Sequence, residues 1–140
     1  MMNERETEVE NMCREFSGAF QEKLSWKWDS RFETVLAEFS VEDQESVRAV
    51  LDRYFNMTWD RSTIGSAPDN VQTITSDLGG LMPGQLFFTS DPGRDTMLFC
   101  AWWPWGNGKT ISIRVAPSKK ESLGLDKSQQ NEAFKRCFGL

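Results

Sequence analysis

Apolar residues recur at spacings of three and four in the first part of the chain, which is the pattern of amphipathic helices. One helix is predicted over residues 4–24, a second after Ser30, where Glu33 completes a capping box, and a third after Ser40. The side chains expected to face inward are Val9, Met12, Cys13, Phe16, Phe20 and Leu24 in the first helix, Phe32, Val35, Leu36 and Phe39 in the second, and Val47, Val50, Leu51, Tyr54 and Phe55 in the third. The helical half therefore spans residues 4–57.

Beyond a polar stretch at residues 59–70, the pattern changes to apolar and β-branched runs separated by Gly and Pro turns. Strands are predicted over residues 71–78, 85–90, 96–105 and 109–116, and their short connections favour an antiparallel meander. Asp126 can begin a last helix over residues 126–138. The expected fold is a single α+β domain of two layers over residues 1–140, with N-terminal amphipathic helices, a four-stranded antiparallel meander within residues 71–116 and a C-terminal helix.

The last two predicted strands carry three tryptophans within four positions, next to an Asn-Gly pair at residues 107–108. Asn-Gly is favoured at the centre of a type I′ turn, so a two-residue loop is predicted. Alternation then places Trp102 on the isoleucine-rich face, and Trp103 and Trp105 on the other face beside Arg114. A three-residue loop would turn Trp103 and Trp105 toward the isoleucines instead.

Two interpretations of these tryptophans follow from the sequence. Large apolar side chains are normally buried, so helices on both faces of the sheet would make all three indoles part of the core. Tryptophan and arginine are also enriched at interface hot spots, and this favours a partner-binding patch. Leu81 and Met82, in a loop rich in Gly and Pro, would add an apolar rim to that patch. The residues predicted to bind a partner are Trp103, Trp105, Arg114, Leu81 and Met82.

Composition places the chain among ordinary globular proteins and argues against two classes of partner. Of its 140 residues, 39% are hydrophobic and 26% charged, and the formal net charge is -5 with a pI near 4.8. The acidic balance disfavours a nucleic-acid binder, which needs a basic surface. The N-terminus is acidic and has no apolar run, so we expect no signal peptide, no membrane segment and a cytoplasmic location.

The residues that carry most protein chemistry are missing or scattered. There is no histidine, which excludes Ser-His-Asp and Cys-His catalysis. Cys13, Cys100 and Cys137 lie far apart and are expected to be small buried side chains. The Gly-Lys-Thr at residues 108–110 matches only the end of a phosphate-binding loop, and the acidic turn at residues 91–95 lacks calcium-loop spacing. No metal, cofactor or catalytic residue is therefore expected.

Two functional hypotheses remain. The first is a non-enzymatic interaction domain of adaptor, chaperone or immunity type, which binds a polypeptide partner or itself through the aromatic sheet face. Small size and acidity are shared with secretion chaperones and toxin-neutralising immunity proteins, and an apolar patch can pair with its own copy as a homodimer. The alternative is a small-ligand pocket lined by Trp59, Arg61 and Arg114, in which a histidine-independent enzyme is conceivable.

Overall fold

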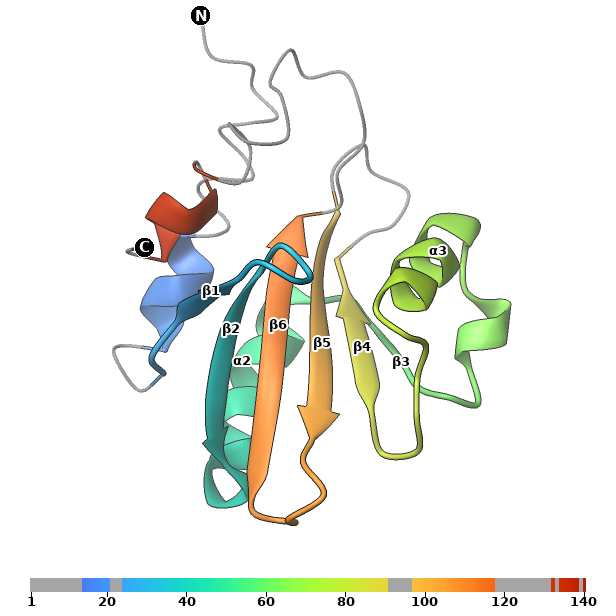
Figure 1. The fold of residues 1–140 in the computed structure, drawn as a ribbon, viewed down its shortest axis with the longest axis horizontal. Coiled ribbons are helices and arrows are strands. Elements are labelled where there is room, and N and C mark those ends of the chain that lie inside the picture. The colour runs from blue at the N-terminus through green and yellow to red at the C-terminus, as the bar shows by residue number, and fades with distance from the viewer. Residues whose placement is uncertain (1–13, 21–23, 91–96, 118–131, 133, 139) are drawn as a thin grey trace, which may run out of the picture.

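A single antiparallel sheet of six strands organises the molecule in the computed structural model (Figure 1). The structure describes residues 14–20, 24–90, 97–117, 132, 134–138 and 140. The spatial order of the strands is β1-β2-β6-β5-β4-β3, and every neighbouring pair is antiparallel. The strands are β1 Lys27–Asp29, β2 Thr34–Ser40, β3 Met57–Trp59, β4 Leu86–Thr89, β5 Leu98–Pro104 and β6 Thr110–Pro117. The predicted α+β class is confirmed.

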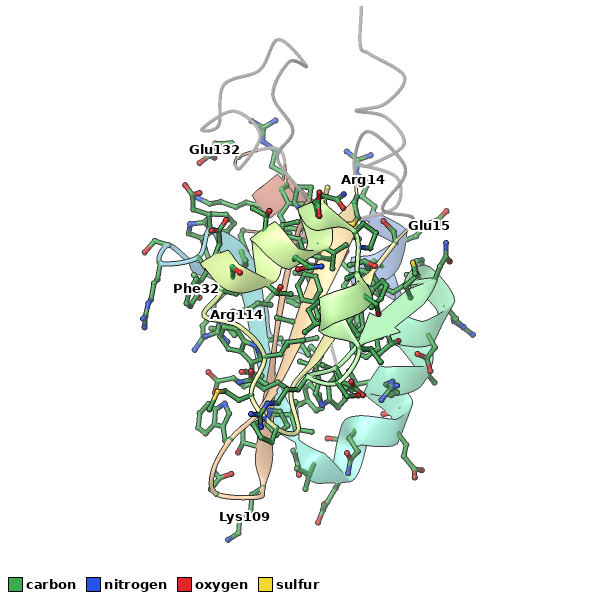
Figure 2. All side chains as sticks on the ribbon, turned by 90° about the vertical axis from the view of Figure 1, so that its right-hand side faces the viewer. Arg14, Glu15, Phe32, Lys109, Arg114 and Glu132 are labelled. Carbon is green, nitrogen blue, oxygen red and sulfur yellow. The ribbon has the colours of Figure 1, made fainter. Side chains whose placement is uncertain are left out.

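Helices lie on both sides of this sheet. Helix α2 spans Gln44–Tyr54 and α3 spans Asp69–Asp77, and Figures 1 and 2 show them on opposite sides. Short 3-10 turns occupy Val41–Asp43 (η1) and Ile64–Ser66 (η2). Residues 14–19 and 134–137 are also helical, and they belong to the helices predicted at the two ends of the chain. The remaining parts of those two predictions lie largely outside the described residues, although Leu24 lies in a bend and not in a helix.

The predicted four-stranded meander is wrong in two elements. Residues 30–39, expected as a helix, form a turn and the strand β2, and Glu33 adopts a φ of 55° instead of capping a helix. Residues 71–78, expected as the first strand, lie almost entirely in α3. The short strands β1 and β3 were not predicted, and β2 pairs with β6 inside the sheet. The first half of the chain therefore contributes three strands and is not purely helical.

The main core lies between the sheet and α2, on what we call the α2 face. Alternation along β2 and β6 turns Val35, Ala37 and Phe39 to this face together with the isoleucines of β6, and Trp102 of β5 joins them. Phe55, at the end of α2, contacts Phe88 of β4 with ring centroids 6.2 Å apart. Each fully buried apolar side chain of the size of valine or larger stabilises the fold by roughly 1.5–3 kcal/mol.

The opposite side, the α3 face, is covered unevenly. Near β3 and β4 it is buried: Phe87 and Phe99 stack with ring centroids 5.4 Å apart, and Val71 of α3 is fully buried. Toward β6 and β2 the cover comes from the turn between β1 and β2. This second region of the α3 face contains Trp103 and Arg114.

Candidate functional site

The β5–β6 hairpin has the predicted register with a different loop. Trp103 pairs with Ser112, as the two-residue loop required. The loop itself has four residues, 106–109: the Trp105 amide donates to the Thr110 carbonyl at 2.8 Å, and the Gly108 amide donates to the Trp105 carbonyl at 3.2 Å. Of the predicted Asn-Gly pair only Gly108 has a positive φ, of 69°, so the turn is not type I′. Both loops have an even number of residues, so the faces of the strands are unchanged.

Trp103 is half-buried and contacts two side chains, Arg114 and Phe32. The Arg114 guanidinium carbon is 4.2 Å from its ring centroid, which agrees with the predicted position of Trp103 beside Arg114. The Phe32 ring packs edge-on against Trp103 at 5.7 Å, and the Arg114 guanidinium carbon is 5.6 Å from the Phe32 ring centroid, so the three side chains contact one another. Figure 2 shows Phe32 close to Arg114 on the side of the sheet away from α2. The Trp103 Nε1 atom is buried and has no hydrogen-bond partner among the described residues. Trp103 is therefore packed against its neighbours and offers little surface to a partner.

Arg114 is occupied by an ion pair with Asp29 of β1. Its Nε donates to Asp29 Oδ2 at 2.9 Å, and the two side chains are only 16% and 14% exposed. A second donor, Nη1, lies 3.3 Å from Ser112 Oγ. Because Asp29 neutralises the guanidinium, Arg114 serves to join β1 to β6 and is poorly placed to receive an anion.

Among the described residues, two of the three exposed large apolar side chains, Met82 and Trp105, lie at one end of the sheet, and the third, Leu140, lies beyond the C-terminal helical residues. Trp105 is 44% exposed and Met82 61% exposed. The pairing of Leu86 with Trp102 brings the loop before β4 to the same end as the β5–β6 loop (Figure 1). We call this surface the end patch, and its exposed members are Met82, Pro83, Pro104 and Trp105. Leu81, which was also predicted as a contact residue, is partly buried against the core.

The three residues of the alternative ligand pocket do not meet. Trp59, Phe87, Ala101 and Arg114 follow one another across neighbouring strands, so Trp59 and Arg114 are three strand spacings apart, about 14 Å. Trp59 is buried, and its Nε1 donates to Thr89 Oγ1 at 3.2 Å. Arg61 is exposed in the turn that follows β3. The geometry therefore gives no support to a shared anion site.

Asp60, between Trp59 and Arg61, has a structural explanation. Its Oδ1 accepts a 2.6 Å hydrogen bond from the Ser62 hydroxyl and further bonds from the backbone amides of Ser62 and Thr63. The Ser62 hydroxyl bond is the main cause that lowers the pKa of Asp60. The Asp60 carboxylate therefore stabilises the turn after β3, and its contacts give no indication of a chemical role.

The described cysteines and acidic side chains likewise show no arrangement that indicates a chemical role. Cys100 is fully buried in β5, and burial raises the pKa of its thiol far above neutrality, so it is protonated and unreactive. Within the described part of the chain, no group of three His, Cys, Asp or Glu side chains is placed to hold a metal ion. A search of the same residues finds no helix with the length and apolar character needed to cross a membrane. Cys137 is half-buried, and Cys13 lies outside the described residues.

Two residues of the site were not predicted from the sequence. Asp29 and Phe32 hold Arg114 and Trp103, but both fall in a segment that was partly assigned to a helix. The available indication was Asp-Ser at residues 29–30, which favours a turn.

Comparison with protein families, curated proteins and solved structures finds no match for this chain.

Proposed function

We propose that this chain is a non-enzymatic domain that binds a polypeptide partner through the end patch. The observation that carries the proposal is the contrast among three neighbouring tryptophans: Trp102 is buried, Trp103 is half-buried, and Trp105 is 44% exposed. Exposing an indole to water is costly, and exposed tryptophan close to other apolar side chains is typical of interface hot spots. Met82 supplies a flexible apolar neighbour that adapts to a partner surface.

The Trp103 layer supports this role by making the hairpin rigid. Arg114 and Phe32 both contact the Trp103 ring and each other, and Asp29 fixes Arg114. Because these contacts hold the end of β5 in place, Trp105 loses little conformational entropy when it binds a partner. Trp103 and Arg114, predicted as direct contacts, are therefore proposed as positioning residues behind the contact surface.

Charge near the end patch favours a partner with a basic rim. The Val41 amide donates to the Lys109 carbonyl at 2.9 Å, so the η1 turn lies against the β5–β6 loop. Glu42 and Asp43 follow at once, and both are exposed. Complementary charge at a rim accelerates association and selects partners more than it adds affinity.

Capture of a partner from cells that naturally make the protein tests the proposal. We expect Trp105→Ala to abolish capture while changing the free energy of unfolding by less than about 1 kcal/mol, because much of the indole is already in water. Leu140→Ala is the matched control, since Leu140 is also 44% exposed but lies beyond the C-terminal helical residues. Capture that survives Trp105→Ala would contradict the proposal.

The concentration dependence of the sedimentation coefficient separates a foreign partner from self-association. A foreign partner requires the wild-type protein to sediment independently of its concentration. An association that grows with concentration and disappears in Trp105→Ala would identify the partner as a second copy of the chain.

A further inference from the structure

The outer edge of β2 is only half paired. β2 has seven residues, but β1 pairs only with Thr34, Val35 and Leu36. From residue 37 to residue 40, the backbone has β6 on one side and no strand among the described residues on the other. An unpaired edge of this kind presents backbone donors and acceptors that can accept another strand.

The hydrogen-bond pattern shows which residues face outward. The Val41 amide points to Lys109, next to β6. Backbone groups alternate in direction along a strand, so those of Phe39 and Ala37 also point to β6. The N–H and C=O groups of Glu38 and Ser40 therefore point away from the sheet.

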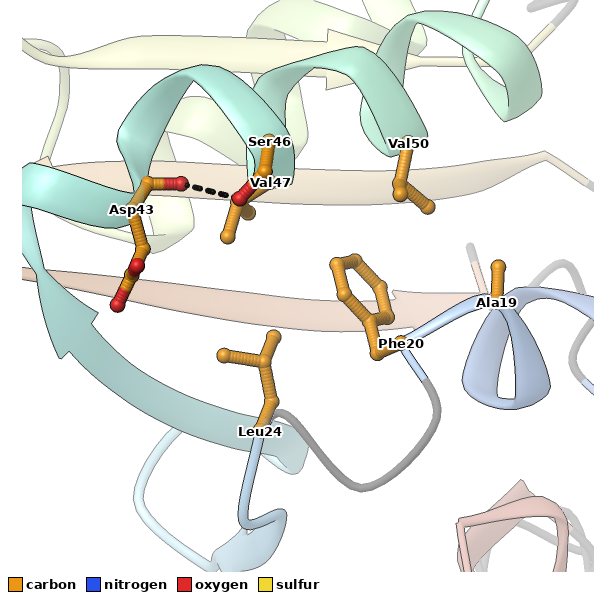
Figure 3. A pocket seen from close by; sticks show the side chains of 7 residues that line it. All are labelled: Ala19, Phe20, Leu24, Asp43, Ser46, Val47 and Val50. Atoms are coloured by element: carbon orange, nitrogen blue, oxygen red, sulfur yellow. Dashed lines mark hydrogen bonds between the residues drawn. The ribbon is translucent and has the colours of Figure 1, made fainter.

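A pocket of about 350 Å³ opens between the start of α2 and the residues Ala19, Phe20 and Leu24 that precede β1 (Figure 3). Five of the seven described residues that line it are apolar, and Asp43 stands at the end where α2 begins, with its carboxylate directed toward β2. The other residues that line it are Ala19, Phe20, Leu24, Ser46, Val47 and Val50. A volume of this size accepts a bulky apolar side chain. The pocket lies near the end of β2, because Asp43 follows Ser40 by only three residues.

We propose that an extended segment of a polypeptide partner pairs with β2 at Glu38 and Ser40 and places an apolar side chain in this pocket. The inference rests on the proposed function, because it takes the occupant to be part of a polypeptide partner. Backbone pairing would supply affinity, and the pocket would give specificity for one side chain, because every second side chain of the bound segment faces it. The partner residue opposite Glu38 points to the α3 face, while its neighbours point into the pocket.

Charge identifies the occupant as a basic segment and not a second copy of this chain. Glu38 is partly exposed and reaches Lys27 at 3.2 Å, and Glu42 and Asp43 follow at the end of the strand. Two copies paired through this edge would bring their Glu38 side chains and acidic turns together, which is unfavourable. A segment that alternates basic and apolar residues would satisfy both the acidic edge and the pocket.

The probe is a seven-residue synthetic peptide that alternates lysine and leucine and carries fluorescein, with binding to the full chain followed by fluorescence anisotropy. The control peptide has the same composition with the lysines and leucines in two blocks. We expect the alternating peptide to bind roughly tenfold or more tightly than the block peptide, since only its leucines share one face of a strand.

Two pairs of protein variants separate the edge from the pocket. Glu38→Pro removes an outward N–H and leaves the β2–β6 ladder intact, whereas Glu38→Thr loses the same charge but keeps the N–H. Ser46→Lys fills the pocket, whereas Ala49→Lys adds the same charge at an exposed position of α2 that does not line it. We expect Glu38→Pro and Ser46→Lys each to weaken binding by roughly tenfold, and their controls by less than about threefold.

The proposal is overturned if the two peptides bind equally, if each control variant weakens binding as much as its partner, or if the protein dimerises through an edge that Glu38→Pro abolishes. Ser46→Lys leaves the sheet untouched, so it remains informative should Glu38→Pro fail to fold by circular dichroism. Partner capture that depends on Trp105 is unaffected by these outcomes, so failure of this inference and failure of the proposed function are distinguishable.

Discussion

The β5–β6 and β1–β2 hairpins are neighbours in one sheet but are stabilised in different ways. β5 and β6 pair over seven residues each, from Leu98 opposite Pro117 to Pro104 opposite Ile111. β1 pairs with β2 over only three. The short hairpin is completed by side chains of the long one, through the Asp29–Arg114 ion pair and the Phe32–Trp103 ring contact. A long hairpin sets its own register, whereas a short edge hairpin depends on its neighbour.

The two connections also differ in backbone conformation. Each contains one residue with a positive φ, Gly108 at 69° between β5 and β6, and Glu33 at 55° between β1 and β2. Glycine adopts this region without steric cost, whereas a side chain with a Cβ atom does not. The long hairpin is therefore relaxed at its turn, and the short one is strained.

The largest expected effect is on the long hairpin. Trp102→Ala should lower the free energy of unfolding by about 3–5 kcal/mol, because the indole is 5% exposed and packs between Phe39 and Phe88. Urea unfolding followed by circular dichroism measures the loss. A decrease below about 1 kcal/mol would show that this hairpin is not the centre of the core.

Removing the link between the hairpins should have an intermediate effect. Asp29→Ala leaves the Arg114 guanidinium without its carboxylate in a mostly buried position, and it should cost about 2 kcal/mol. Hydrogen exchange should accelerate at the β1 amides and stay unchanged in β5 and β6. Lys27→Ala is the control, because its ion pair with Glu38 is solvent-exposed and should contribute less than about 1 kcal/mol.

A smaller loss is expected from Gly108→Ala. The added Cβ meets no atom within 4 Å, so the cost comes from the positive φ alone and should be about 1 kcal/mol. Thermal unfolding followed by circular dichroism measures it. Equal stability of the variant and the wild type would show that the loop shifts readily to another conformation.

The smallest effect should have the opposite sign. Glu33→Gly relieves a strained φ but gives the unfolded chain more freedom, and the net gain should be about 0.5 kcal/mol. Chemical unfolding of the two proteins side by side measures the difference. A loss of more than about 1 kcal/mol would mean that the Glu33 side chain contributes more than its backbone costs.

The same comparison explains what the sequence could and could not predict. The β5–β6 register was predictable because alternation and a Gly-containing turn are local features, and only the loop length was wrong. β2 was misassigned because Phe32, Val35, Leu36 and Phe39 also fit helical spacing. Both faces of β2 are largely buried, which removes the polar alternation that would have distinguished a strand from a helix.

Helix α3 shows the converse error. Val71, Thr73 and Thr75 alternate and are β-branched, a composition that favours a strand. The same segment also has helical spacing, because side chains three and four positions apart form one stripe: Val71, Ile74, Thr75 and Leu78. The segment forms a helix because this stripe packs against the rest of the molecule. In the candidate site, Phe32 and Asp29 were unpredictable for another reason: their contacts with Trp103 and Arg114 join segments about 70 and 85 residues apart.

The position of β6 has a consequence for how the chain is made. β6 is the last strand among the described residues, yet it lies inside the sheet between β2 and β5. A ribosome must therefore synthesise the chain through Pro117 before the two halves of the sheet can join. Until then β2 and β5 each carry an open edge, so the nascent protein has a period in which a chaperone would protect it from aggregation.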